Sequence, residues 1–253
     1  MSKAPAVDYA LEIIEFMASR NSDTGIADIS NTLNINKNAV SRVLEALLEK
    51  NWIYLSDTVQ KKYRLTLRPF SMVSKNVGNN ELVKIASPLL KELNDNLEDA
   101  VYLGVEHGRN VLYLLHYDSV KPVRINGRVG GEYPMNCSAP GKVIISNGER
   151  EKFEAFFAHG AEKRTPNTIT EEKAFTKEAE KIRKLGYALD NEEFAPGIVC
   201  IAVPVYDCDG KVVASVGVSS LTLYDTIDTL INKKLPLLNE CAKKISVALG
   251  YNG

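Results

Sequence analysis

The chain has 253 residues, a formal net charge of −1 at pH 7 and an apolar content of 45%. These values are typical of a globular protein with one large or two ordinary domains, and they exclude a globally basic polypeptide. No apolar run reaches the roughly 18 residues that span a bilayer, and the N-terminus lacks a signal-peptide pattern, so we expect a cytoplasmic protein with no membrane partner.

Residues 1–66 are predicted to form a small DNA-binding domain. Apolar positions that include Val7 and Leu11 mark a first helix, which would brace the two helices that follow. Over residues 24–48, two short amphipathic helices are separated by a turn at Asn34, as in a helix-turn-helix. The apolar stripe of the second of these helices must be buried, and it comprises Val40, Val43, Leu44, Leu47 and Leu48.

The polar face of that second helix is predicted to read DNA in the major groove, with Arg42 as the best candidate for a base contact. Two short strands around residues 57–60 would form a wing whose basic residues contact the sugar-phosphate backbone. The predicted DNA-binding residues are Lys37, Asn38, Ser41, Arg42, Lys61, Lys62 and Arg64. The alternative is a small helical subdomain with a solvated charged face and a hairpin that binds nothing.

Positive and negative charges balance over residues 1–65, so one copy of this domain should bind DNA weakly and several copies should act together. From Leu67 to Asn80 the periodicity loosens, which predicts a linker helix or hinge.

A second domain is predicted over residues 81–253. We expect helices over 81–96, 140–146, 170–185 and 224–249, and strands over 100–105, 110–117, 123–129, 198–206 and 211–221. Gly186 is expected to end one of these helices in the left-handed conformation. The order of elements predicts an α+β fold in which a central antiparallel sheet is flanked by helices.

Several segments together resemble the IclR family of transcriptional regulators over nearly the whole chain. They are residues 6–14 in the first helix, NAVSRVLEAL over 38–47, YRL over 63–65, CSAPGK over 137–142, GYALDNEE over 186–193 and PGIVCIAVPV over 196–205. The resemblance implies a GAF-like effector domain behind a winged helix-turn-helix, dimers that often pair into tetramers, and control of catabolic operons by a small metabolite. One departure is Asn51, where relatives usually have glycine, although asparagine tolerates the left-handed conformation.

An effector site can be argued from the residues that begin the helix at 140. Ser138 precedes Ala139, Pro140 and Gly141, the pattern of a helix N-cap with proline in the first turn, and the free amide groups of such a terminus favour an anion. The resemblance implies that the rest of the site comprises Ile125, Asp190, Cys200, Gly217 and Ser219. The alternative is that Ser138 only caps a helix and that Cys200 is a small core residue.

These observations predict a ligand-responsive, DNA-binding transcriptional regulator, most often a repressor in this family, that takes a small organic acid. As a homodimer it would place two recognition helices in successive major grooves of a pseudo-palindromic operator, with a dimer of dimers as a further assembly. The competing class is an enzyme with Cys200 or Cys137 as nucleophile. We disfavour it because no histidine is expected near Cys200, and the same argument leaves no metal or cofactor expected.

Overall fold

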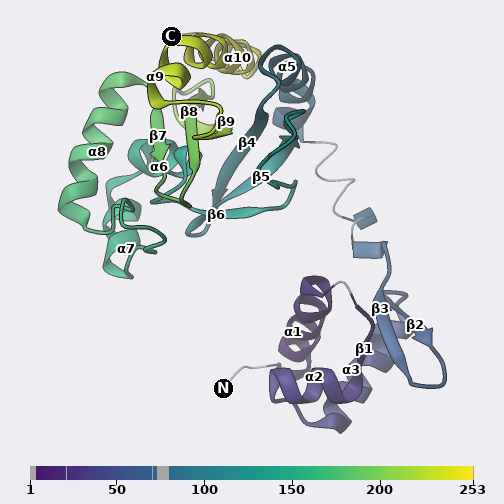
Figure 1. Ribbon diagram of the computed structural model, residues 1–253. Helices are drawn as coiled ribbons and strands as arrows, with labels where there is room; N and C mark the ends of the chain where they lie inside the picture. Colours follow the sequence, from purple (N-terminus) through teal and green to yellow (C-terminus); the bar gives the residue numbers. More distant parts are fainter. Residues whose placement is uncertain (1–3, 21, 70, 73–79, 253) are drawn as a thin grey trace. The chain divides into compact units, whose positions relative to one another are not determined.

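The computed structural model describes residues 4–20, 22–69, 71–72 and 80–252. The chain divides into two compact units, residues 1–78 and 79–253, which are considered separately (Figure 1). Much of the expected linker over 67–80 falls outside the described residues, so the linker and the three domain boundaries stay predictions.

The first unit is a winged helix-turn-helix. Its elements are α1 (Pro5–Ser19), β1 (Thr24–Gly25), α2 (Ile26–Leu33), α3 (Lys37–Glu49), β2 (Ile53–Asp57) and β3 (Lys62–Leu65), with the strands antiparallel in the order β1-β3-β2. Helix α2 ends at Asn34, whose φ of 55° is left-handed, and Asn36 caps α3 by accepting the Asn38 N–H at 2.9 Å. Asn51 is also left-handed, with φ of 57°, as expected.

The apolar stripe of α3 is buried as predicted apart from the half-buried Leu48, whereas only part of the predicted apolar face of α1 turns inward. Ile13 and Met17 are buried, whereas Val7 and Leu11 are 57% and 56% exposed. The reason is helical geometry: residues four apart share a face, so the face that buries Ile13 and Met17 turns Val7 and Leu11 outward. Two large apolar side chains of α1 are therefore left on the surface.

The second unit is built on one six-stranded antiparallel sheet in the order β6-β5-β4-β9-β8-β7. Its strands are β4 (Ala100–His107), β5 (Asn110–Tyr117), β6 (Glu132–Pro134), β7 (Ala188–Asn191), β8 (Ile198–Tyr206) and β9 (Val212–Leu221). Its helices are α5 (Glu81–Leu97), α6 (Ala139–Asn147), α7 (Arg150–Ala158), α8 (Glu172–Leu185), α9 (Ile227–Thr229), a π-helical turn (Leu230–Lys234) and α10 (Leu235–Ala248). None of the described helices has the length and apolarity that a bilayer crossing requires.

Helices cover both faces of this sheet, α5 and α10 on one side and α6 and α8 on the other (Figure 1). Alternation along β8 fits this layering: Val199 and Ile201 enter the core under α5 and α10, and Cys200 enters the one under α6. Gly186 ends α8 at φ of 76°, as expected. The predicted α+β class, with an antiparallel sheet between helices, is confirmed.

Several elements of the second unit differ from the prediction, among them the short β7, which was not expected. No strand forms over 123–129, where Val123 and Val129 are 54% and 56% exposed; the chain crosses there as a loop, and the short β6 pairs with β5 instead. Helix α7 was not expected. The C-terminal helix begins at Ile227 rather than 224 and is interrupted by the π-helical turn.

Candidate DNA-binding face and effector cavity

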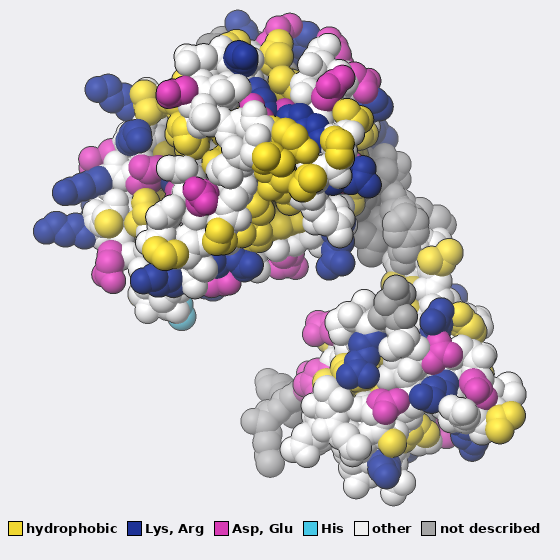
Figure 2. Space-filling view, viewed as in Figure 1, with side chains coloured by type: hydrophobic (Ala, Val, Ile, Leu, Met, Phe, Trp, Pro, Cys, Tyr) yellow, Lys and Arg dark blue, Asp and Glu magenta, His cyan; other side chains and the backbone are white. Residues whose placement is uncertain are grey.

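The start of α3 presents polar side chains to solvent. Lys37, Asn38 and Arg42 are exposed, whereas Ser41 is half-buried and its hydroxyl donates to Glu45 Oε1 at 3.2 Å. Figure 2 shows that basic and acidic side chains alternate over the visible face of this unit. The placement of individual basic groups, rather than a basic surface, must therefore direct any DNA contact.

Arg42 lies at one edge of this face, where it also borders a groove between α1 and α3. The groove has a volume of about 660 Å³ and is lined on the α1 side by Pro5, Ala6, Tyr9 and Ala10. A side chain at this edge can extend toward DNA or lie over the groove. The direction of the Arg42 side chain is therefore less restricted than that of Lys37 and Asn38, which do not line the groove.

The basic residues of the wing differ in how far they are already paired. Asp57 Oδ1 accepts the N–H groups of residues 59 and 60 at 2.8 Å, which shapes the tip, and Lys61 follows there, exposed and left-handed with φ of 49°. Lys62 lies 4.0 Å from Asp28, and Arg64 forms an ion pair with Asp23. Lys61 can therefore meet a phosphate without losing an internal partner.

The second unit contains a small cavity where the N-terminus of α6 meets the sheet. Its volume is about 30 Å³. Residues predicted to bind the effector make up much of its wall, namely Ile125, Ser138, Ala139, Pro140, Asp190, Cys200 and Ser219. Segments distant in sequence thus meet at one place, as the sequence predicted, although a ligand here must be short or must displace part of the wall.

Two predicted site residues lie behind the wall rather than in it. A Cβ on Gly217 would lie 2.3 Å from Tyr102 Cε2, so this glycine lets the Tyr102 ring lie flat on β9. A Cβ on Gly141 would lie 2.4 Å from Met135 Cα, so this glycine lets α6 pack on the backbone below it. Both act on the cavity through packing.

Ser138 occupies the N-cap position of α6, as predicted, but its side chain does not cap the helix. The hydroxyl turns back and donates to the Pro134 carbonyl at 2.7 Å. The amide groups of the first turn are therefore not engaged by the residue expected to satisfy them, and they remain a site for an acceptor from elsewhere.

The sequence prediction missed the aromatic part of the wall, which comprises Tyr102, Tyr113, His116, Tyr133 and Phe194. The Tyr113 ring lies between those of Tyr102 and Tyr133, at centroid distances of 4.5 and 4.2 Å. Among the described residues, neither Tyr102 Oη nor His116 Nδ1 has a well-aligned hydrogen-bond partner, and both are buried. The expectation that no histidine lies near Cys200 was wrong, because His116 borders the same cavity.

Asp190 faces the cavity from β7. Burial raises its pKa from 3.8 to about 7, although Oδ1 accepts the N–H groups of Glu193 and Phe194 at 2.8 and 3.1 Å, which lowers it. Nearby, the buried Lys142 donates to Glu193 Oε1 at 2.6 Å and to the Leu189 carbonyl at 2.8 Å, which ties α6 to β7. Asp190 is therefore held in place and can carry a proton near neutral pH.

The two candidate nucleophiles are poorly suited to catalysis. Burial raises the pKa of Cys137 to about 12 and that of Cys200 well above its ordinary value. Cys200 Sγ lies 3.1 Å from Ser219 Oγ, while His116 Nε2 is 3.1 Å from Asp118 Oδ1. A thiolate is disfavoured at both positions, and Nε2 of the imidazole is engaged by Asp118. Within the described part of the chain, no three metal-ligating side chains converge.

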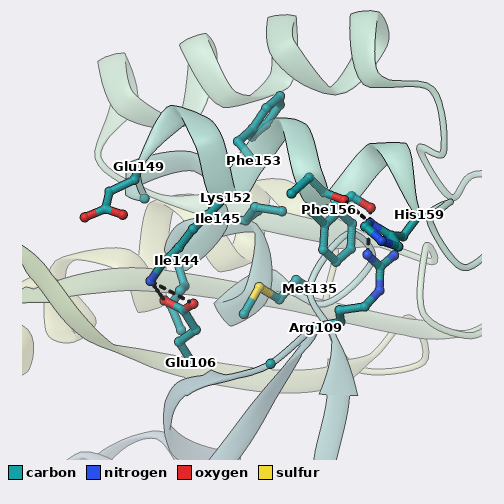
Figure 3. A pocket seen from close by; sticks show the side chains of 13 residues that line it. Glu106, Arg109, Met135, Ile144, Ile145, Glu149, Lys152, Phe153, Phe156 and His159 are labelled. Carbon is teal, nitrogen blue, oxygen red and sulfur yellow. Dashed lines mark hydrogen bonds and ion pairs between the residues drawn. The ribbon is translucent and has the colours of Figure 1, made fainter.

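A larger groove of about 370 Å³ lies between the β4–β5 turn, α6 and α7 (Figure 3). Lys152 Nζ is 3.2 Å from Glu106 Oε1, and the Arg109 guanidinium bonds the Phe156 and Gly160 carbonyls while stacking on the Phe156 ring. These charged groups are already paired within the protein. The small cavity, whose wall has unpaired polar atoms, is the stronger candidate for a ligand site.

Comparison with known proteins agrees with both halves of this description. The IclR helix-turn-helix domain matches residues 6–56, and the bacterial transcriptional regulator IclR C-terminal domain matches residues 74–247. The HTH-type transcriptional regulator KdgR of Escherichia coli K12 is 29% identical over 91% of this chain and 87% of its own length. The HTH-type transcriptional repressor AllR of that strain is 25% identical over 98% of this chain and 91% of its own.

Among solved structures, the crystal structure of Thermotoga maritima IclR matches with a TM-score of 0.81 and 27% identity, over 98% of this chain and 99% of that one. The two family domains together cover most of the sequence, one on each unit. The resemblance seen in the sequence is thus confirmed, and the chain belongs to the IclR family of ligand-responsive, DNA-binding transcriptional regulators.

Proposed function

We propose that this regulator is a homodimeric repressor of a catabolic operon, released from a pseudo-palindromic operator when a small organic acid enters the cavity at the start of α6. The observation that carries the proposal is a pair of buried polar atoms in the wall, Tyr102 Oη and His116 Nδ1, which have no well-aligned hydrogen-bond partner among the described residues. Such groups are unfavourable until a ligand satisfies them.

Three features of the cavity favour an acid. The Ser138 hydroxyl leaves the α6 amides uncapped, and a helix N-terminus attracts negative charge. The Tyr102 hydroxyl supplies a further donor. Asp190 would repel an anion only when ionised, and its pKa of about 7 keeps it largely protonated in mildly acidic solution.

A dimer is proposed because a single DNA-binding unit has little net positive charge and needs a second copy for useful affinity. The exposed Val7 and Leu11 of α1 support this, since a second copy could cover them. No catalytic role is proposed, because both buried thiols are held in the protonated form. AllR, a relative over nearly the whole chain, is named a repressor, which supports the proposed sign of regulation.

The test has two stages and uses the full chain. Selection from random duplex DNA should enrich an inverted repeat whose half-sites lie about one helical turn, roughly 10 base pairs, apart. Operator affinity is then measured by fluorescence anisotropy with and without a panel of small carboxylates. We expect at least one acid to weaken operator binding and to raise the thermal midpoint of the protein.

The outcomes separate the parts of the proposal. Enrichment of an asymmetric or single half-site would contradict the dimeric mode of binding. An acid that binds but strengthens operator binding would contradict release as the mode of control. Failure of every carboxylate to bind, while uncharged metabolites of similar size do, would contradict the acid effector.

A further inference from the structure

His116 reaches the cavity because of an irregularity in β5. Leu103 pairs with Leu115 and Gly104 with Tyr113, so Leu114 is an extra residue in the strand. In a regular strand, residues 113 and 116 would face opposite sides of the sheet. The bulge instead sends both Leu114 and Leu115 towards the core under α5 and α10, and places Tyr113 and His116 together on the α6 side.

The imidazole is fixed in place once it is there. Its Nε2 lies 3.1 Å from Asp118 Oδ1, and its ring is stacked on Tyr113 with an interplanar angle of 10°. The loop over residues 118–131, here called the cover loop, lies against it: a Cβ on Gly127 would be 2.2 Å from His116 Cε1. The side chain is only 6% exposed.

The partner on Nε2 decides what Nδ1 can do. An ionised carboxylate only accepts hydrogen bonds, so Nε2 must carry the proton that points to Asp118. In the neutral ring, Nδ1 is then an acceptor without a proton. Nδ1 is buried, His116 lines the cavity, and no donor among the described residues reaches this nitrogen.

We infer that His116 determines effector specificity by accepting a hydrogen bond from a hydroxyl group of the ligand, so that the effector is a hydroxy acid. This rests on the proposed function, in which the carboxylate lies at the start of α6. The cavity wall thus offers donors at the start of α6 and an acceptor on His116, which call for both an acceptor and a donor on one short molecule. A simple carboxylic acid satisfies the donors and leaves Nδ1 unpaired.

An amino acid would also offer a donor, but its ammonium group fits this wall poorly. Asp118 is already engaged by His116 Nε2, aromatic rings make up much of the wall, and a single nitrogen acceptor does not replace the hydration of an ammonium ion. Transfer of a hydroxyl group from water into the cavity costs less free energy than transfer of an ammonium ion, and the hydroxyl group needs only one acceptor.

The experiment measures binding of matched acids to the full chain by titration calorimetry. The pairs are lactate and propionate, 3-hydroxybutyrate and butyrate, and 4-hydroxybenzoate and benzoate, with alanine as the amino analogue of lactate. We expect at least one hydroxy acid to bind on the order of tenfold or more tightly than its partner, since a site built for a hydroxyl group rejects the analogue that lacks it. Alanine should bind more weakly than lactate.

Two variants locate the effect. His116→Phe keeps a flat ring against Tyr113 but removes Nδ1, so the preference for the hydroxy acid should fall to within about threefold while the deoxy acid binds as before. Tyr102→Phe removes a donor for the carboxylate and should weaken both members of a pair alike. If His116→Phe does not fold by circular dichroism, Asp118→Ala, which frees the ring without removing it, should reduce the same preference.

The inference would be overturned if acids bind the wild-type protein without preference for the hydroxyl group, if alanine binds more tightly than lactate, or if the preference survives in His116→Phe or, should that variant not fold, in Asp118→Ala. In each case acid binding itself would stand. Absence of binding by every acid tested would instead overturn the proposed acid effector and this inference together.

Discussion

Asp190 shows how burial changes the chemistry of one side chain in this cavity. Its pKa lies near 7, because burial destabilises the carboxylate more than the two backbone N–H donors stabilise it. The titratable groups that influence it or are influenced by it are Cys200 on the neighbouring β8, Tyr102 on β4, and Glu193 and Lys142. Near pH 7, loss of the Asp190 proton therefore adds a negative charge to the cavity wall.

We predict that Asp190→Asn removes a pH dependence of folding stability. Between about pH 4 and pH 7 the folded state retains a proton that the unfolded state has lost, so stability falls as pH rises through this window and levels off above it. The rise in pKa from 3.8 to about 7 corresponds to about 4 kcal/mol. Urea unfolding from pH 4 to 8 should show a smaller decline in the variant, whose amide oxygen can still accept both backbone N–H groups.

Asp209→Asn is the matched control, because this aspartate is exposed in the β8–β9 turn. It should leave the wild-type pH profile unchanged. Equal profiles for wild type and Asp190→Asn would show that Asp190 titrates near its ordinary value.

Arg42 and Lys61 are predicted to contribute to DNA binding in different ways. Arg42→Ala should cost roughly 1–3 kcal/mol on the operator and relax specificity. Lys61 has a positive φ, so Lys61→Asn removes its charge without forcing alanine into that conformation, and it should weaken all sequences alike and lower the salt slope by about one. Arg64→Gln should reduce the slope less, because Asp23 already neutralises Arg64.

Anisotropy titrations on specific and random duplexes at several salt concentrations measure these effects. Lys84→Ala, on the exposed side of α5 in the other unit, is the charge-matched control. A specificity change from Lys61→Asn equal to that from Arg42→Ala would contradict the division of roles.

At the scale of elements, the bulge in β5 explains why the sequence revealed only part of the cavity. The helix-turn-helix and the start of α6 follow from local patterns, helical spacing and proline in the first turn. Strict alternation along β5 would place His116 and Tyr113 on opposite faces of the sheet, so the sequence gives no reason to include His116 in the site. A bulge depends on pairing between strands, which a single strand's residues do not encode.

The cover loop and α7 were missed for related reasons. Apolar residues alternate over 123–129 as in a strand, yet Ile125 closes the cavity while Val123 and Val129 remain exposed. Helix α7 buries Phe156 and Phe157 next to each other against α8, so its apolar residues do not follow helical spacing along one narrow stripe. In both segments tertiary packing determines the secondary structure, which the pattern of apolar residues alone does not specify.

A buried charge cluster fixes the base of the cover loop, and we predict that Lys234→Met destabilises the second unit. Lys234 bonds both Asp99 and Asp225, while Lys121 of the cover loop lies 2.5 Å from Asp99 Oδ1. Burial tends to raise the pKa of Asp225, but hydrogen bonds from Lys234 and Ser220 outweigh it and lower the pKa. Removing Lys234 leaves two buried carboxylates with one cation, which should cost about 3 kcal/mol in urea unfolding.

Lys244→Met is the control on the neighbouring helix. Lys244 pairs with Glu240 at the surface, and such exposed pairs contribute little to stability. Similar losses in the two lysine variants would mean that the buried cluster adds no more than a surface pair.

At the scale of the whole molecule, the chain combines a DNA-binding unit with a ligand-binding unit, and we expect each to bind its partner weakly on its own. The DNA-binding unit has no excess of positive charge, and the cavity has room for little more than a water molecule as it stands. A state that opens the cavity can therefore differ from the state that binds the operator. A ligand shifts the balance between two such states only by the difference in its affinity for them.

This requirement gives a prediction that links the two units without specifying how they move. If a hydroxy acid weakens operator binding by a given factor, operator DNA must weaken binding of that acid by the same factor, which for regulators of this kind is about 5- to 150-fold. Calorimetric titration of the acid into protein alone and into protein saturated with operator measures one side, and anisotropy with and without acid measures the other. A non-operator duplex at the same concentration is the control, because it occupies the basic groups without selecting the specific state. A loss of operator affinity that levels off at one finite factor as the acid concentration rises would establish that the cavity and the recognition helices respond to one equilibrium, whereas a loss that keeps growing with acid concentration would mean that the acid competes directly for the DNA-binding face.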